Sequence, residues 1–161
     1  MPKHHETRSL PYTAQQMYDL VADVARYPEF LPWTSAARIR SRVPVEGGLG
    51  GAGGLGGEVL EADLVISFKV FRESFGSRVT LRPDFAAGGG GRILTEYLDG
   101  PFRHLKSEWV FADRPGGCQV TFDVDFEFRN AILAGVIGFV FNEAMARVVR
   151  AFEARAKVLY G

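Results

Sequence analysis

The sequence predicts an α+β fold, in which a curved antiparallel sheet of about seven strands wraps around one long C-terminal helix. Two short helices are expected after the first strand. Residues 120–128 alternate strictly between apolar and polar side chains, which is typical of a half-buried strand. Residues 131–160 carry an apolar stripe at helical spacing. A helix of that length measures about 45 Å and crosses a whole sheet.

The first strand and the first helix have clear local signals. Residues 3–10 are expected to form the strand, which leads to Pro11. Thr13 and Gln16 have the spacing of a capping box, in which each side chain bonds the other residue's backbone amide. This predicts a helix over residues 14–22.

An aromatic and proline cluster follows that helix. Because a proline disfavours helical geometry in the preceding residue, helix boundaries are expected at Tyr27 and Leu31. For Phe30 and Trp33, plugging one end of the core and lining a cavity are equally good interpretations. The cluster comprises Tyr27, Pro28, Phe30, Leu31, Pro32 and Trp33.

Residues 38–43 are expected to form the second strand. Residues 47–57 are almost all glycine, and we interpret them as a tolerated surface loop rather than a lid over a pocket. A second glycine turn is expected at residues 86–91. The remaining strands are expected at residues 58–69, 72–81, 92–98, 105–112 and 120–128.

The inward faces of these strands and of the long helix are apolar. A strongly curved sheet and a helix cannot meet everywhere, so we expect an apolar cavity between them. The residues expected to line it are Phe30, Trp33, Phe68, Phe75, Val79, Trp109, Phe122, Val124, Phe126, Val140, Ala144, Met145, Val148 and Phe152.

Two polar residues share the face of Phe75, namely Glu73 and Ser77. They are interpreted as polar contacts at the cavity, as ion-pair partners across a strand, or as a sign of a different register. A buried carboxylate without a partner is too costly to be the default.

The helical stripe is expected to continue through Ala156 and Leu159. Residues 131–141 are apolar all round, so either the short helices cover them or they contact a membrane or a partner. The contact surface expected for a membrane comprises Ile132, Ile137, Phe139 and Phe141, beside residues 30–33.

The net charge and the motifs of the sequence argue against several functional classes. The formal net charge is zero, so no nucleic-acid partner is expected. Cys118 is the only cysteine, which excludes an intramolecular disulfide. His4, His5 and His104 are interpreted as solvent-exposed, and no metal site is expected. No catalytic motif is present, and we expect neither an enzyme nor a cofactor.

The longest apolar run is too short for a membrane span, and the N-terminus lacks the apolar core of a signal peptide. We therefore expect a cytoplasmic, bacterial protein of one domain over residues 1–161. A peripheral position at the inner membrane is compatible with the apolar surface described above.

Six segments of the sequence carry a family resemblance, namely residues 18–33, 72–75, 99–102, 108–109, 122–128 and 154–161. Together they resemble the coenzyme Q-binding START-domain family, which belongs to the polyketide cyclase-like superfamily of helix-grip folds. Two features depart from that family: Thr34 stands where many relatives have cysteine, and the glycine segment 47–57 is longer than expected.

The resemblance implies a carrier or chaperone that binds a polyprenylated quinone, such as ubiquinone, or a similar lipid in an apolar cavity and supports respiration. The same superfamily branch includes ribosome association toxins, which block the joining of ribosomal subunits. Under that alternative the partner is the ribosome. Aromatase/cyclase enzymes share the fold and are a third class.

Overall fold

The computed structural model describes residues 3–44, 57–68, 71–84, 90–100, 102–129 and 131–161. Within them, the side chains at positions 68, 71, 83, 84, 90, 133 and 136–142 are not described. The elements are β1 (Lys3–Leu10), α1 (Ala14–Ala22), η1 (Val24–Glu29), β2 (Thr34–Pro44), β3 (Glu58–Phe68), β4 (Phe71–Asp84), β5 (Gly90–Asp99), β6 (Phe102–Arg114), β7 (Gly117–Phe128) and α2 (Ala131–Tyr160).

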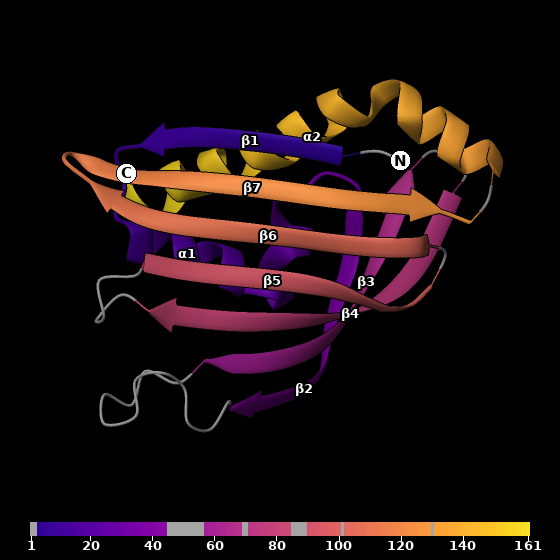
Figure 1. Ribbon diagram of the computed structural model, residues 1–161, viewed down its shortest axis with the longest axis horizontal. Coiled ribbons are helices and arrows are strands. Elements are labelled where there is room, and N and C mark those ends of the chain that lie inside the picture. The colour runs from indigo at the N-terminus through magenta and orange to yellow at the C-terminus, as the bar shows by residue number, and fades with distance from the viewer. Residues whose placement is uncertain (1–2, 45–56, 69–70, 85–89, 101, 130) are drawn as a thin grey trace.

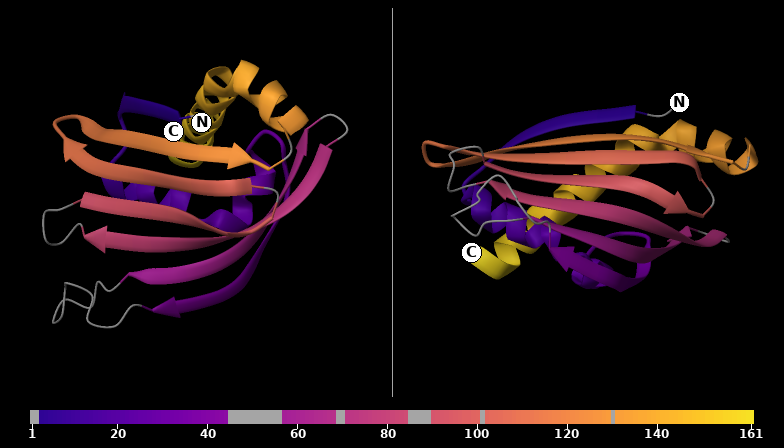
Figure 2. Two further views of the ribbon diagram at one scale, coloured as in Figure 1. Left: turned by 45° about the vertical axis from the view of Figure 1, so that its right-hand side comes forward. Right: turned by 60° about the horizontal axis from the view of Figure 1, so that its bottom comes forward.

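The strands form one antiparallel sheet in the order β1-β7-β6-β5-β4-β3-β2. The sheet curves strongly, and α2 runs diagonally across its concave side (Figures 1 and 2). Helices α1 and η1 lie on that same side. The predicted architecture is therefore confirmed, including the long helix over 131–160.

Strand β1 has the predicted bounds and β3 ends at Phe68, whereas β2, β4, β5, β6 and β7 are longer than the sequence pattern indicated. β2 starts at Thr34 instead of position 38, and β5 already starts at Gly90, within the expected 86–91 turn. Strand β7 alternates as predicted, with Val120, Phe122 and Val124 buried. The glycine segment 47–57 lies outside the described residues except for Gly57.

The capping box at the start of α1 is confirmed. The backbone N–H of Gln16 donates to Thr13 Oγ1 at 3.0 Å, and the backbone N–H of Thr13 donates to Gln16 Oε1 at 2.9 Å. The backbone N–H of Ala14 donates to Asp113 Oδ1 at 3.0 Å, which fixes the start of the helix on β6. The apolar face then buries Met17, Leu20 and Val21.

The helix boundary predicted at Tyr27 is wrong, because the 3-10 helix η1 continues through Pro28 to Glu29. After Pro28, the backbone N–H groups of Phe30 and Leu31 both donate to the carbonyl of Tyr27. The fixed φ of proline is compatible with the geometry of a 3-10 helix.

The buried stripe of α2 also differs from the prediction near its end. Val149, Phe152 and Ala156 are buried, whereas Leu159 is 50% exposed. Tyr160 packs in its place, since its hydroxyl donates to the Gln16 carbonyl at 3.1 Å. The contact with α1 thus sets the rotation of the last turn.

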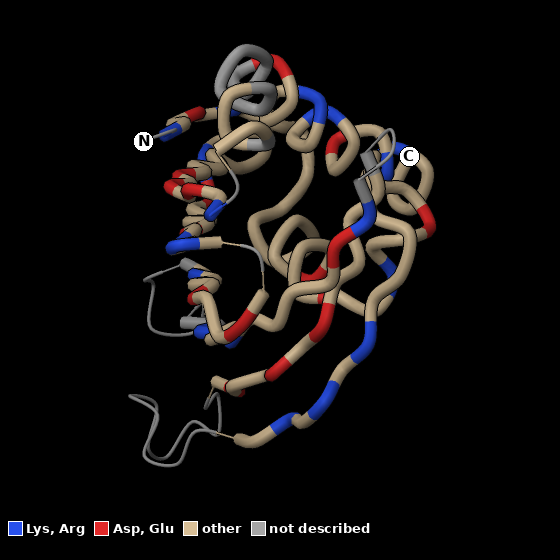
Figure 3. The backbone as a smooth tube through the Cα atoms, turned by 90° about the vertical axis from the view of Figure 1, so that its right-hand side faces the viewer, with Lys and Arg blue, Asp and Glu red and all other residues tan. Residues whose placement is uncertain are grey.

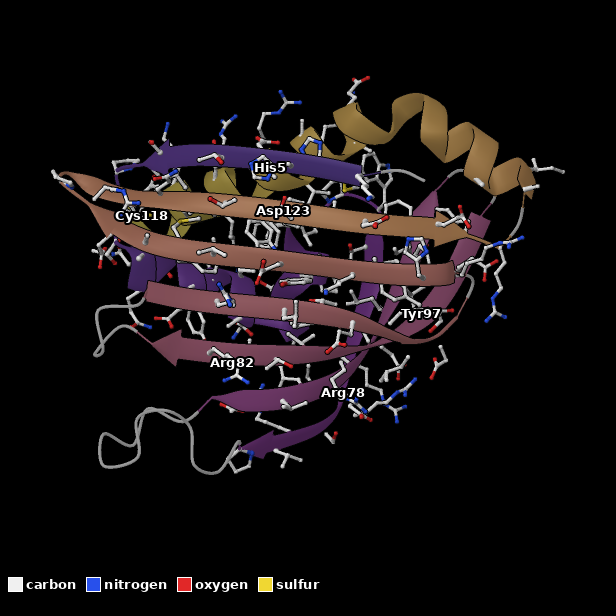
Figure 4. The ribbon with its side chains drawn as sticks, in the orientation of Figure 1. His5, Arg78, Arg82, Tyr97, Cys118 and Asp123 are labelled. Carbon is white, nitrogen blue, oxygen red and sulfur yellow. The ribbon has the colours of Figure 1, made fainter. Side chains whose placement is uncertain are left out.

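The interpretation of His4 as solvent-exposed is wrong. Alternation along β1 places its even positions toward α2, and the His4 side chain is only 12% exposed and bonds Glu6 at 2.8 Å. His5 points to the outer face, beside Asp123 of β7 (Figure 4). Next on the inner face, Arg8 makes two bonds to Glu153, at 2.6 and 2.9 Å, and thereby holds β1 to α2.

Candidate functional site

A cavity of about 390 Å³ lies between the concave face of the sheet, α2 and the connection from η1 to β2. Its wall is predominantly apolar. The lining residues are Tyr27, Leu31, Pro32, Trp33, Thr34, Leu64, Ile66, Phe75, Thr95, Phe102, Leu105, Ser107, Trp109, Phe122, Val124, Phe126, Phe128, Glu143, Ala144, Met145, Arg147, Val148 and Phe152.

One part of the wall is an aromatic cluster that joins β6, β7 and α2. The rings of Trp109 and Phe122 stack with their centroids 4.3 Å apart. Phe152 of α2 meets the Trp109 ring at a steep angle, at 5.1 Å. Such geometries are favourable for aromatic pairs, so this part of the wall is well packed.

A second aromatic cluster centres on Phe102, at the start of β6. Its ring stacks on Phe128 at 4.5 Å and meets Phe75 and Phe126 edge to face at 5.2 and 5.4 Å. Tyr97 holds the segment in place, since its hydroxyl accepts a hydrogen bond from the Phe102 N–H at 3.1 Å. Between the two clusters, the wall consists of smaller aliphatic and hydroxyl side chains.

The connection between η1 and β2 forms a side wall. Trp33 has a φ of +64°, a backbone conformation that bulky residues rarely adopt. Such strain persists only where the surrounding structure enforces it, and it concentrates at functional sites. Tyr27 is fixed by a hydrogen bond from its hydroxyl to the Val21 carbonyl, and burial raises its pKa well above the usual value.

Among the described residues, the charged side chains that reach the cavity come from α2. Arg147 donates to Glu143 at 3.2 Å, one helical turn away. Their side chains are 57% and 66% exposed, respectively. This ion pair therefore lies at the opening of the cavity, and we call it the rim pair.

The structure brings most of the predicted lining residues together. Those that line the cavity are Trp33, Phe75, Trp109, Phe122, Val124, Phe126, Ala144, Met145, Val148 and Phe152. Whether they contact a ligand stays a prediction. The predicted side chains of Phe68 and Val140 lie outside the described residues.

Two predicted lining residues do not reach the cavity. Val79 is buried in the core, beside the wall residue Thr95. Phe30 packs against Phe152 with the ring centroids 5.3 Å apart, and it is not among the residues that line the cavity. Glu73 is exposed and Ser77 is buried, and neither lines the cavity, so the proposed polar contacts there are wrong.

Several wall residues were not predicted. Alternation along the strands puts Leu64, Ile66 and Leu105 on the inward face, but the predicted cavity lining did not include them. Thr95 and Ser107 occupy the same faces as Ile93 and Trp109, so the alternation alone contained this signal. The positions of Tyr27, Leu31 and the rim pair depend on how α2 and η1 are placed, which periodicity does not encode.

The arginines of β2 lie beside the carboxylates of β3 (Figure 3). Arg40 bonds Asp63 and also contacts Asp99 at 3.2 Å, while Arg42 bonds Glu58 at 3.1 Å. The guanidinium of Arg40 lowers the pKa of Asp63 by hydrogen bonding. The row of arginines on β2, which we call the basic ridge, is therefore neutralised at Arg40 and Arg42 by carboxylates of β3 and β5.

Within the described ranges, no group of three His, Cys, Asp or Glu side chains is arranged to hold a metal ion. Nor does any helix that the structure describes have the length and apolar character to cross a membrane.

Residues 10–153 match the family described as polyketide cyclase/dehydrase and lipid transport. The chain belongs to this family. The family resemblance inferred from the sequence motifs is thereby confirmed.

Relatives within the family have different roles. A protein of Rickettsia prowazekii named ribosome association toxin RatA is 35% identical, over 98% of this chain and 97% of its own length. The mitochondrial coenzyme Q-binding protein COQ10 homolog B of Xenopus laevis is 29% identical over 99% of this chain and 59% of its own length.

A solved structure of a START superfamily protein from Mycobacterium smegmatis covers 98% of each chain with a TM-score of 0.73. At 16% sequence identity, that likeness shows the fold alone.

Proposed function

We propose that this protein binds a polyprenylated quinone such as ubiquinone, or a similar isoprenoid lipid, in the cavity between the sheet and α2. It acts as a carrier or chaperone that supports respiratory electron transport. The observation that carries the proposal is the wall itself, which two aromatic clusters and aliphatic side chains form almost completely. An apolar wall of this kind gains free energy by covering an apolar ligand.

The volume limits what the cavity encloses. About 390 Å³ is near the lower end of the range of roughly 300–1,000 Å³ that is usual for ligand pockets. A headgroup and the first part of a tail fit this volume, whereas a long polyprenyl tail does not. The remainder of such a tail leaves past the rim pair, toward a membrane or a partner.

A binding role is better supported than a catalytic one. The charged wall residues, Glu143 and Arg147, are paired with each other in an exposed position. Tyr27 is held by the Val21 carbonyl, and its raised pKa keeps it protonated. None of these groups combines a perturbed pKa with an open position toward a ligand, as acid–base catalysis requires.

Loading requires contact with a bilayer, so we also propose a cytoplasmic protein of bacterial origin that touches the inner membrane reversibly. Ile132 is 75% exposed and is one candidate contact. The side chains of Ile137, Phe139 and Phe141 lie outside the described residues.

The expectation that residues 30–33 lie at the same end of α2 as Ile132 is wrong for Phe30. This residue packs on Phe152, twenty residues further along the helix, or about 30 Å at 1.5 Å per residue. The membrane contact is therefore proposed for the start of α2 alone.

A second candidate function is ribosome binding, as the name of the Rickettsia prowazekii relative describes. The observation in its favour is 35% identity over nearly the whole of both chains. The neutralised ridge on β2 does not supply the basic face that binding through phosphate charge requires. This candidate therefore needs a surface other than Arg38, Arg40 and Arg42.

Intrinsic fluorescence tests the proposed function. Both tryptophans of the chain, Trp33 and Trp109, line the cavity, so a bound quinone will quench most of the emission. We expect saturable quenching by a short-chain ubiquinone, and the same titration of unfolded protein in urea serves as control. Quenching that does not saturate, or that is equal in the unfolded chain, would contradict binding in the cavity.

A further inference from the structure

Two hydroxyl side chains lie side by side within the apolar wall. Thr95 of β5 and Ser107 of β6 are direct cross-strand partners, and both line the cavity. The next residues in the same row across the sheet are Val79 on β4 and Val124 on β7. The pair is thus a polar spot between apolar neighbours.

Neither hydroxyl is used by the protein within the part of the chain that the structure describes. No side-chain hydrogen bond joins Thr95 or Ser107 to a described residue, whereas the Tyr27 hydroxyl on the side wall bonds the Val21 carbonyl. An unpaired hydroxyl in an apolar wall lowers stability compared with an apolar side chain of the same shape. The two groups are therefore available to a ligand.

Their surroundings indicate which part of a ligand they meet. Ser107 is two positions before Trp109 on the same face of β6, which places the two side chains about 7 Å apart along the strand. Trp109 stacks on Phe122 there. A flat conjugated ring against this aromatic cluster therefore has its ring oxygens within reach of the hydroxyl pair.

We propose that Thr95 and Ser107 form the headgroup subsite of the cavity, which receives a carbonyl or hydroxyl oxygen of a flat ligand ring. This inference rests on the proposed function and specifies its ligand class. A serine or threonine hydroxyl both donates and accepts hydrogen bonds. The subsite therefore serves the carbonyl of an oxidised quinone and the hydroxyl of the reduced quinol alike, which suits a carrier rather than a redox catalyst.

The test compares ligands with and without ring oxygens. The probes are a short-chain ubiquinone, its quinol, and the hydrocarbon dye diphenylhexatriene, which has no polar atom. The double variant Thr95→Val/Ser107→Ala keeps the wall shape and removes both hydroxyls. We expect its affinity for the quinone and the quinol to fall about tenfold, as the loss of two hydrogen bonds implies. Its affinity for diphenylhexatriene stays the same or rises.

Controls separate the subsite from general damage. Thr121→Val changes a threonine on the outward face of β7 and leaves all three affinities unchanged. The melting temperature of the double variant is expected to equal or exceed that of the wild type, because it removes polar groups from an apolar wall. If the double variant does not fold, the single variants Thr95→Val and Ser107→Ala are each expected to lose about threefold for the quinone only.

The outcomes distinguish the two proposals. An unchanged quinone affinity in the double variant, or an equal loss for diphenylhexatriene, overturns the subsite while cavity binding stands. A wild-type protein that binds none of the three probes overturns the proposed function and the subsite with it.

Discussion

Arg155 of α2 donates a hydrogen bond to Glu29 at the end of η1, at 2.8 Å, and its guanidinium lies over the Phe30 ring at 5.3 Å. This contact joins the long helix to the segment that forms the side wall of the cavity. The Nε atom of Arg155 is buried and has no hydrogen-bond partner among the residues that the structure describes. The contact is therefore a weak clamp, because part of its free energy is offset by an unsatisfied donor.

The clamp is expected to control how fast ligands leave. Arg155→Met keeps the apolar stem over Phe30 but removes the ion pair, so we expect ligand dissociation to accelerate several-fold. The free energy of unfolding should fall by only about 0.5–1 kcal/mol, since Glu29 is half-exposed. Stopped-flow fluorescence measures the rate. Arg150→Met, an exposed arginine on the same helix, is the control, and equal rates in both variants would show that the clamp does not gate the cavity.

Two adjacent valines on α2 allow a comparison between a residue of the cavity wall and a residue of the packed core. Val148 lines the cavity, whereas Val149 is 3% exposed and belongs to the core. Val149→Asp buries a charge and is expected to cost several kcal/mol of stability. Val148→Asp should cost less, since its side chain faces the cavity opening and not the packed core, but should abolish quinone binding. Thermal melts and fluorescence titrations measure both effects, and the reverse order of stabilities would mean that the helix is rotated differently.

The buried thiol of Cys118 is expected to lower the stability of the folded protein at alkaline pH. Burial, together with the charge of Asp113, raises the pKa of its thiol from 9.0 to about 11. Because the unfolded chain loses this proton first, the thiol favours unfolding as the pH rises from 9 to 11, and has no effect below pH 9. Cys118→Ala should therefore lose less stability than the wild type across that window in urea titrations. Parallel curves for the two proteins would contradict the raised pKa.

Ribosome association is tested by sucrose gradients of a bacterial lysate with added protein. Because Arg40 and Arg42 of β2 are paired with carboxylates, we expect equimolar protein to leave the proportion of joined ribosomes unchanged. Bovine serum albumin at the same concentration is the control for nonspecific effects. A shift toward free subunits that disappears at high salt would favour the ribosomal function over the carrier function.

The sequence predicted the sheet and its inward face well, because alternation in strands such as β7 depends on one local rule. It predicted Phe122, Val124 and Phe126 on the cavity wall for the same reason. The capping box at Thr13 was also predictable, since both partners lie within four residues of each other.

Apart from the ends of η1 and of several strands, the errors concern contacts between distant elements. Leu159 is exposed and Tyr160 packs in its place, because the Tyr160 hydroxyl donates a hydrogen bond to a carbonyl of α1. The side chain of His4 is largely buried because α2 packs against β1, and no pattern within β1 encodes that contact. Phe30 packs against Phe152 and Arg155 instead of lining the cavity. In each case the deciding neighbour is more than a hundred residues away in the chain.

Mass spectrometry of organic extracts from the purified protein tests the central claim most directly. Protein prepared without detergent, from cells that make isoprenoid quinones, should yield a quinone or isoprenoid lipid in near-stoichiometric amount. Val148→Asp prepared in parallel should yield little or none. Extracts of folded wild-type protein without any lipid, together with no uptake of added quinone, would contradict the account.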